Sequence, residues 1–340
     1  MSKLVFASLS RIADFEETNY DLQPLGKDEW ETSDYVEAVV TGEPSELYNI
    51  EDREGRMVPV EAGDRVVGAL GDRAATLEGV GTWAAVEGKE IQALTNAGLF
   101  GAFTSISQFL PRPISLQYRG HLMRDGRKLS MLDYALQSES FEFAIPTILL
   151  VGTSMSAGKT ETGRLVVKEL SKAGYDVIGA KLTGAGRFRD VLSYRNKGAS
   201  RIFDFVDVGL PSTVVSEQQF RSAIRPLLNK INDCAPDFLV AEAGASPLEP
   251  YNGAAAIEEL GDNICCTILC ASDPYAVVGV QHAFQLKPDL VTGPTTNTTA
   301  GIDLVKKLSG VDAINILDEA SLPAFQEFLT ECLKLDRELS

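Results

Sequence analysis

Apolar residues are distributed differently in the two halves of this 340-residue chain. From residue 3 to about residue 140 they form short runs separated by Gly, Pro, Asn and Asp, as at 35–40, 57–60 and 65–70. Such runs predict strands and hairpins. Glycines at turn-like intervals in residues 61–73 favour a small β-sandwich or barrel. No catalytic constellation is evident in this half.

The second half alternates short apolar runs with helical patterns. The runs predict strands at 147–151, 176–180, 238–241, 266–269, 289–291 and 313–317. The helical patterns fall near 160–173, 217–232, 253–260, 275–286, 299–309 and 321–336. Strands that are almost entirely apolar are buried on both faces, which indicates a doubly wound, mostly parallel α/β sheet. We therefore predict a β-rich domain over residues 1–143 and an α/β domain over residues 144–340.

Composition and charge narrow the classes of function. The chain is 44% hydrophobic and 23% charged, as is typical of soluble globular proteins. Its net charge of -17 repels polyanions, which argues against a nucleic-acid or anionic-membrane surface. No apolar run approaches the roughly 20 residues needed to span a bilayer. The first residues also lack a secretory signal, so we expect a cytoplasmic protein.

Cysteine and histidine usage argues against several kinds of metal or catalytic centre. The five cysteines include no C-x-x-C pair set, and Cys265 and Cys266 lie inside an apolar run. We therefore expect buried, reduced thiols. His121 and His282 are the chain's two histidines, so neither a Ser-His-Asp triad nor a histidine-built zinc centre is expected.

The strongest chemical signal is the sequence G-T-S-M-S-A-G-K-T at residues 152–160, between an apolar strand pattern and a helical pattern. This order is typical of a P-loop, or Walker A motif, in which backbone N–H groups and a helix N-terminus bind phosphate. Lys159 is expected at the β- and γ-phosphates, and the Thr160 hydroxyl is expected to bind Mg²⁺. The predicted phosphate-binding residues are Gly152, Thr153, Ser154, Met155, Ser156, Ala157, Gly158, Lys159 and Thr160. Thr153 replaces the usual first Gly, and an ordinary glycine turn before a helix is the alternative interpretation.

Three more polar residues stand near predicted strand ends. Glu242 follows an apolar strand and could reach Mg²⁺, although a solvated strand-end glutamate is the alternative. Lys181 ends the second strand, at the sheet edge where open α/β folds bind ligands, or it is a snorkelling surface lysine. Asn297 lies in a segment rich in hydroxyl and amide groups that could recognise a purine. A helix N-cap at Thr298 or Thr299 explains that segment equally well.

The pattern G-T-x-x-x-x-G-K-T resembles the P-loop of dethiobiotin synthetase and its relatives. These relatives include the cobyrinic acid amide synthases and a group of P-loop proteins containing D-glutamate N-acetyltransferases. The resemblance covers roughly residues 146–320 and is specific for the superfamily but not for a substrate. It implies that Glu242 is a metal ligand and that Lys181 faces the substrate and the transferred phosphate. It also implies that the chains pair as homodimers.

The second metal carboxylate is open between three residues. The resemblance places it at Asp190, in the segment R-F-R-D-V-L. Asp204 and Asp207 compete for the same role, because the acetyltransferase-like relatives have a comparable D-F-V segment. A helix N-cap or a surface salt bridge explains any of the three.

Three functions follow from these assignments. The first is an enzyme of the ligase, synthetase or transferase type that uses ATP and Mg²⁺ to phosphorylate a small carboxylate, carbamate or amine-bearing substrate, with Lys159 and Lys181 as catalytic residues. The second is an N-acyltransferase of the D-glutamate N-acetyltransferase type, in which the P-loop holds the diphosphate of acetyl-CoA. The third is a non-catalytic, nucleotide-gated binding protein. Loops after residues 184, 209 and 246 are expected to select the acceptor.

Overall fold

The computed structural model describes residues 2–42, 49–138, 141–244 and 246–339. The chain divides into two compact units. Unit 1 comprises Met1–Gln137, Ala185–Arg189 and Phe205–Val215, and unit 2 comprises Ser138–Gly184, Asp190–Asp204 and Ser216–Ser340. Two later stretches of the chain therefore belong to the first unit.

Unit 1 is built around a closed ring of strands. Its strands are β1 (Leu4–Phe6), β2 (Asp21–Gln23), β3 (Tyr35–Val40), β4 (Asn49–Glu51), β5 (Met57–Pro59), β6 (Arg65–Leu70), β7 (Asp72–Ala75), β8 (Gly79–Thr82), β9 (Glu90–Thr95), β10 (Leu99–Ile106), β11 (Ser115–Arg124) and β12 (Arg127–Lys128). Neighbours pair in the order β6, β3, β11, β9, β10, and β10 then returns to β6 in parallel. The other pairings in this ring are antiparallel, so the strands form a small barrel.

Alternation along the strands fills the barrel. In β3, Val36, Ala38 and Val40 belong to one buried cluster, because side chains two residues apart share a face of a strand. A methyl group at Gly68 of β6 would lie 2.2 Å from the Gly98 carbonyl oxygen, so a glycine is needed for this close backbone approach. The strands expected at 35–40, 57–60 and 65–70 are confirmed as β3, β5 and β6.

Unit 2 contains a parallel sheet whose central strand leads into the phosphate loop. The strands are β13 (Thr147–Gly152), β14 (Val177–Thr183), β15 (Arg201–Asp204), β16 (Phe238–Ala243), β17 (Ile264–Cys270) and β18 (Leu290–Thr292). They are ordered β15-β14-β16-β13-β17-β18, with every pairing parallel. The chain moves from β13 to one edge, returns at β16 and then crosses to β17. The carboxyl end of β13 is therefore a topological switch point, where α/β sheets bind ligands.

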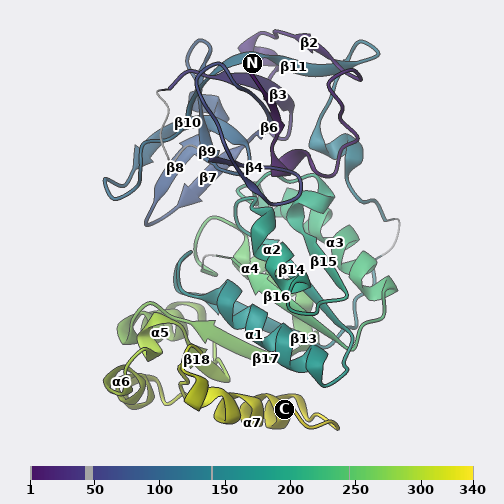
Figure 1. Cartoon of the computed structure of the whole chain (residues 1–340). Helices are drawn as coiled ribbons and strands as arrows, with labels where there is room; N and C mark the ends of the chain where they lie inside the picture. Colours follow the sequence, from purple (N-terminus) through teal and green to yellow (C-terminus); the bar gives the residue numbers. More distant parts are fainter. Residues whose placement is uncertain (1, 43–48, 139–140, 245, 340) are drawn as a thin grey trace. The chain divides into compact units, whose positions relative to one another are not determined.

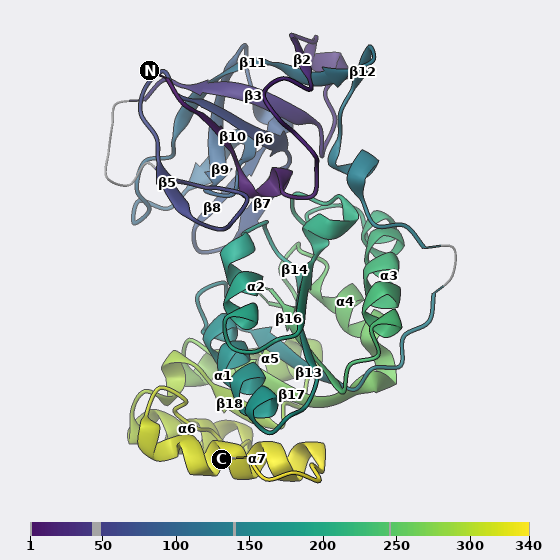
Figure 2. The same cartoon turned by 45° about the vertical axis from the view of Figure 1, so that its right-hand side comes forward.

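Helices connect these strands and cover the sheet. They are α1 (Lys159–Lys172), α2 (Phe188–Arg195), α3 (Glu217–Asp233), α4 (Gly253–Leu260), α5 (Pro274–Phe284), α6 (Thr299–Ser309) and α7 (Leu322–Leu333). Figure 1 shows α1 in front of the sheet and α4 behind it, and α3 lies beside α4 (Figure 2). Local signals start several helices: the Ser216 hydroxyl caps α3, and the Asp273 carboxylate accepts from two backbone N–H groups of α5. Among the described residues, no helix is long and apolar enough to cross a bilayer.

Most of the predicted elements of this sheet are confirmed, with one error. The prediction of a strand at 313–317 is wrong. Ala313 makes an isolated bridge to Val291, and the chain then turns. The Asn315 side chain accepts a hydrogen bond from Leu317 N at 3.1 Å, which favours a turn over an extended strand. The pattern also failed to predict α2 and β15, which are short and weakly periodic.

Candidate functional site

The phosphate loop connects β13 to α1 through residues 153–158. All residues of β13 are buried, so the strand delivers the loop from the centre of the sheet. Gly158 has φ +98° and directly precedes α1, a conformation that disfavours any side chain. Thr153, which replaces the usual glycine, has no positive φ; its hydroxyl accepts from Ser272 N at 3.0 Å and joins the loop to the end of β17. The departure from the usual motif thus has a structural role.

The other residues of the loop differ in exposure. Gly152 is the last residue of β13, Ala157 is buried, Met155 is half-buried and Ser156 is exposed. Lys159 begins α1 and its side chain is 2% exposed. Its Nζ donates to the Ser154 carbonyl oxygen at 2.8 Å, so the ammonium lies over the loop. Burial lowers the pKa of Lys159, and the nearby Glu242 partly offsets this effect.

Thr160 and Glu242 meet at the start of α1. The Thr160 hydroxyl donates to Glu242 Oε2 at 3.1 Å. Because β16 pairs with β13, Glu242 lies opposite Leu150 and near the carboxyl end of the sheet, and it is 4% exposed. The hydroxyl and the carboxylate are both hard oxygen donors, which Mg²⁺ prefers. Two of the three predicted donors, Thr160 and Glu242, are therefore in contact, whereas the third, Asp190, pairs with Lys181.

Tyr194 on α2 also contacts this carboxylate. Its hydroxyl donates to Glu242 Oε2 at 3.0 Å, and its ring is fully buried. Methyl groups at Gly163 of α1 or Gly179 of β14 would each lie 2.6 Å from a Tyr194 atom, so these two glycines make room for the ring. Burial, followed by the charge of Glu242, raises the pKa of Tyr194 well above its usual value, so it remains a proton donor.

The buried Lys181 forms an ion pair with the half-buried Asp190 beside this carboxylate. Its Nζ donates to Asp190 Oδ2 at 2.6 Å, and the register of β14 places Lys181 opposite both Glu242 and Asp204. Burial disfavours the ammonium, but the charges of Asp190 and Glu242 outweigh it and raise the pKa of Lys181. The lysine is thus held charged in a low-dielectric setting.

The three aspartates considered for the second metal ligand have different surroundings. Asp190 contacts Lys181. The buried Asp204, at the end of β15, also helps to raise the pKa of Lys181. Asp207 lies in unit 1, where Arg11 donates to it at 2.7 Å. Asp190 and Asp204 therefore both neighbour Lys181, whereas Asp207 is used in an ion pair of the other unit.

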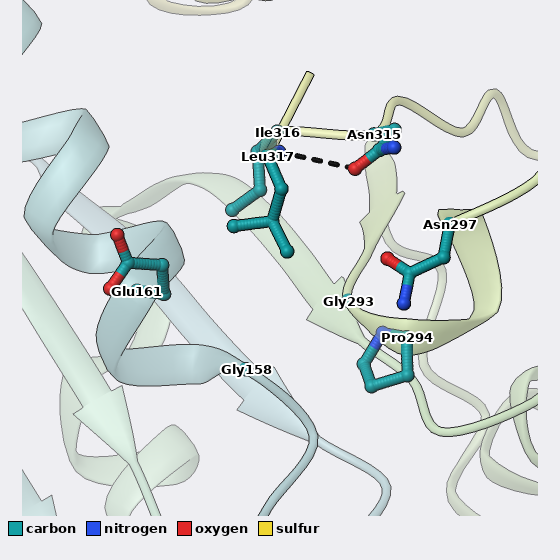
Figure 3. Close-up of a pocket in the computed structure, with 8 residues that line it drawn as sticks. All are labelled: Gly158, Glu161, Gly293, Pro294, Asn297, Asn315, Ile316 and Leu317. Carbon is teal, nitrogen blue, oxygen red and sulfur yellow. Dashed lines mark hydrogen bonds between the residues drawn. The ribbon is translucent and has the colours of Figure 1, made fainter. Parts of the chain in front are cut away.

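A cavity of about 150 Å³ adjoins the helix end of the phosphate loop. Figure 3 shows the side chains of Asn297 and Leu317 on either side of it, with Asn315 above. Gly293 has φ +92°, and a methyl group there would lie 2.3 Å from the Ala157 carbonyl oxygen. Thr298 caps α6 by accepting from Gly301 N at 3.2 Å, so the segment both caps a helix and lines a cavity. Asn315 and Leu317 were missed because their segment was expected to be a strand.

Comparisons with known proteins are limited to weak structural likenesses. No protein-family model and no curated protein matches the chain. Chloroplast FtsY from Physcomitrella patens has 13% identity and TM-score 0.37, covering 56% of this chain and 65% of that one. FtsY from Mycoplasma mycoides has 16% identity and TM-score 0.38, covering 56% and 66%. HypB from Helicobacter pylori, in complex with nickel, has 17% identity and TM-score 0.37, covering 58% and 91%.

The matched part spans less than two thirds of each FtsY chain. The fold of unit 2 is evident from its own geometry: a parallel sheet, a buried central strand, and a strand–loop–helix junction with Lys159 and Thr160 at the start of the helix. This is the phosphate-binding arrangement of P-loop nucleotide-binding folds.

Proposed function

We propose that unit 2 binds ATP with Mg²⁺ and transfers its terminal phosphoryl group to a small anionic acceptor, in a reaction of the ligase or synthetase type. The hydrogen bond between Thr160 and Glu242 carries this proposal, because it unites the hydroxyl of the phosphate loop with a buried carboxylate from the neighbouring strand. The resemblance of the loop to dethiobiotin synthetase supports the same class of reaction.

Thr160 and Glu242 would hold the Mg²⁺, and Tyr194 would fix the orientation of the Glu242 carboxylate. Bound Mg²⁺ neutralises phosphate charge. Lys159 would move its ammonium from the Ser154 carbonyl to the phosphate oxygens, since both acceptors lie along the same loop. The backbone N–H groups at the start of α1 add further donors to the phosphates.

Lys181 would bind the acceptor. Its ammonium is buried and is kept charged by Asp190 and Glu242, so it can stabilise a carboxylate or carbamate without first gaining a proton. Its strand register places it beside the proposed metal ligand Glu242. An acceptor on Lys181 would thus lie near the terminal phosphate, and catalysis would depend mainly on positioning and charge neutralisation.

The cavity beside Gly158 would receive the base. Asn297 and Asn315 each carry an amide, which can both donate and accept hydrogen bonds, as the edge of adenine requires. Pro294 and Leu317 supply apolar surface for the faces of the ring.

Ligand-dependent thermal stability tests this proposal. We expect ATP with Mg²⁺ to raise the unfolding midpoint, because a ligand that binds the native state stabilises it. ADP release should then increase with one member of a panel of small carboxylates and carbamates. The Lys181→Ala variant should retain the midpoint shift but lose the acceptor-dependent ADP release, whereas Lys172→Ala, at an exposed position of α1, should retain both.

Two results would overturn the proposal. A midpoint shift with acetyl-CoA but not with ATP would favour the N-acyltransferase function. Tight ATP binding with no turnover on any acceptor would favour a nucleotide-gated binding protein.

A further inference from the structure

Three possible metal ligands from distant parts of the sequence meet at the opposite end of the sheet in unit 2. Cys266 lies near the start of β17, Asp289 directly precedes β18, and Cys332 lies near the end of α7. The two sulfur atoms and a carboxylate oxygen all lie within 4.8 Å of one another. Figure 1 shows why: α7, in yellow, packs against β17.

The surroundings orient these ligands. Asp289 Oδ2 accepts from Thr267 N at 2.7 Å, which fixes the carboxylate beside the strand that carries Cys266. The Cys266 side chain is buried, whereas Cys332 is half-buried and Asp289 is exposed, so an ion can reach the cluster from solvent. Cys332 also lies in the last turn of α7, where the helix dipole favours a cation.

We propose that Cys266, Asp289 and Cys332 bind a thiophilic divalent cation such as Zn²⁺, with water completing the coordination. Two thiolates and a carboxylate suit Zn²⁺, whose tetrahedral ligands are roughly 3.3–3.8 Å apart, so small side-chain movements would close the site. Each thiol would release its proton to solvent as its sulfur binds the metal. The ion would join α7 to two strands of the sheet.

Cobalt spectroscopy on the full chain tests this site. The protein would be reduced, stripped with a chelator and titrated with Co²⁺ alone. We expect thiolate-to-cobalt charge-transfer bands that saturate at one ion per chain and disappear on addition of Zn²⁺. Zn²⁺ should also raise the unfolding midpoint. The bands identify sulfur ligands, so an ion bound by Thr160 and Glu242 would not produce them.

The matched variants are Cys332→Ser and Cys265→Ser. Cys332 is half-buried, so its replacement leaves the core intact and should remove the bands and the Zn²⁺-dependent shift. Cys265 adjoins Cys266, but its sulfur contacts the Thr147 carbonyl oxygen at 3.4 Å, so Cys265→Ser should retain both. Bands that persist in Cys332→Ser would overturn the proposal. The proposal would also be overturned if the reduced protein gave no bands with Co²⁺. It would likewise be overturned if Cys266 and Cys332 formed a disulfide and bound no metal ion.

Discussion

The two ends of the parallel sheet in unit 2 present different chemistry. At the carboxyl ends of β13, β14 and β16, Lys159, Lys181 and Glu242 supply ammonium groups and hard oxygen atoms. At the amino ends of β17 and β18, Cys266 and Asp289 meet Cys332 and supply two sulfur atoms. Carboxyl strand ends lead into helix N-termini, which favour anions, whereas Cys332 lies at a helix C-terminus, which favours cations. One sheet can therefore present an anion site and a cation site at opposite ends.

The largest effect is expected from Lys159→Ala at the carboxyl end. ATP affinity should fall about 100-fold, because a charged hydrogen bond contributes up to about 3 kcal/mol. The fold should persist, since burial already disfavours this ammonium. Calorimetric titration with ATP and Mg²⁺ measures the change. Unchanged ATP affinity would show that the phosphates do not bind at this end of the sheet. As a control, Co²⁺ binding at the other end should be the same as in the unaltered chain.

Tyr194→Phe should weaken the contribution of Mg²⁺ to ATP binding by about tenfold. The change removes one hydrogen bond to the Glu242 carboxylate, and bonds to charged groups contribute about 1.5–3 kcal/mol. ATP affinity in the presence of a chelator should not change. If Tyr194 had a purely structural role, its replacement would weaken ATP binding with or without Mg²⁺. Tyr175→Phe is the matched control, because its hydroxyl donates to Asp336 on the surface at 2.6 Å. Equal Mg²⁺ dependence in both variants would contradict the role of Tyr194.

Glycine substitutions test how tightly Tyr194 is held. Gly163→Ala would place a methyl group 2.6 Å from the Tyr194 hydroxyl, and such overpacking costs about 1–3 kcal/mol of unfolding free energy. Gly279→Ala in α5 meets no atom within 4 Å and should gain up to about 1 kcal/mol from helix propensity. Urea denaturation measures both. Equal stabilisation by the two changes would show that α1 leaves room around Tyr194.

The smallest effect concerns stability at alkaline pH. Lys159 has a lowered pKa, so it binds fewer protons in the folded chain, and its contribution to stability rises with pH up to the unfolded value near 10.5. Lys181 has a raised pKa, and its contribution is complete below 10.5 and is lost as pH rises through the folded value. Lys159→Met should therefore reduce the slope of unfolding free energy against pH below 10.5. Lys181→Met should make the decline above 10.5 shallower. Identical pH profiles for both variants would contradict this contrast.

Local patterns in the sequence predicted much of unit 2. The phosphate loop, five of the six predicted strands and the helices after them follow from apolar periodicity and from capping residues such as Thr298, which act over a few neighbouring residues. Glu242 and Lys181 were identifiable because each follows an apolar run, near the carboxyl end of β16 or β14. The prediction of a strand at 313–317 failed because it also relied on apolar residues alone. Ala313 bridges to Val291 at the sheet, but the apolar run then continues into a turn.

Contacts between distant residues could not be predicted in this way. Tyr194 reaches Glu242 through space left by Gly163 and Gly179, and no sequence spacing encodes that arrangement. The cysteine pair spans 66 positions, from Cys266 to Cys332, and forms because α7 packs back on β17. Periodicity specifies which face of an element is buried, but the strand order and the packing of helices decide which polar side chains meet. The sequence therefore identified the phosphate loop, whereas the folded chain assembled the carboxylate, tyrosine and thiol groups around the sheet.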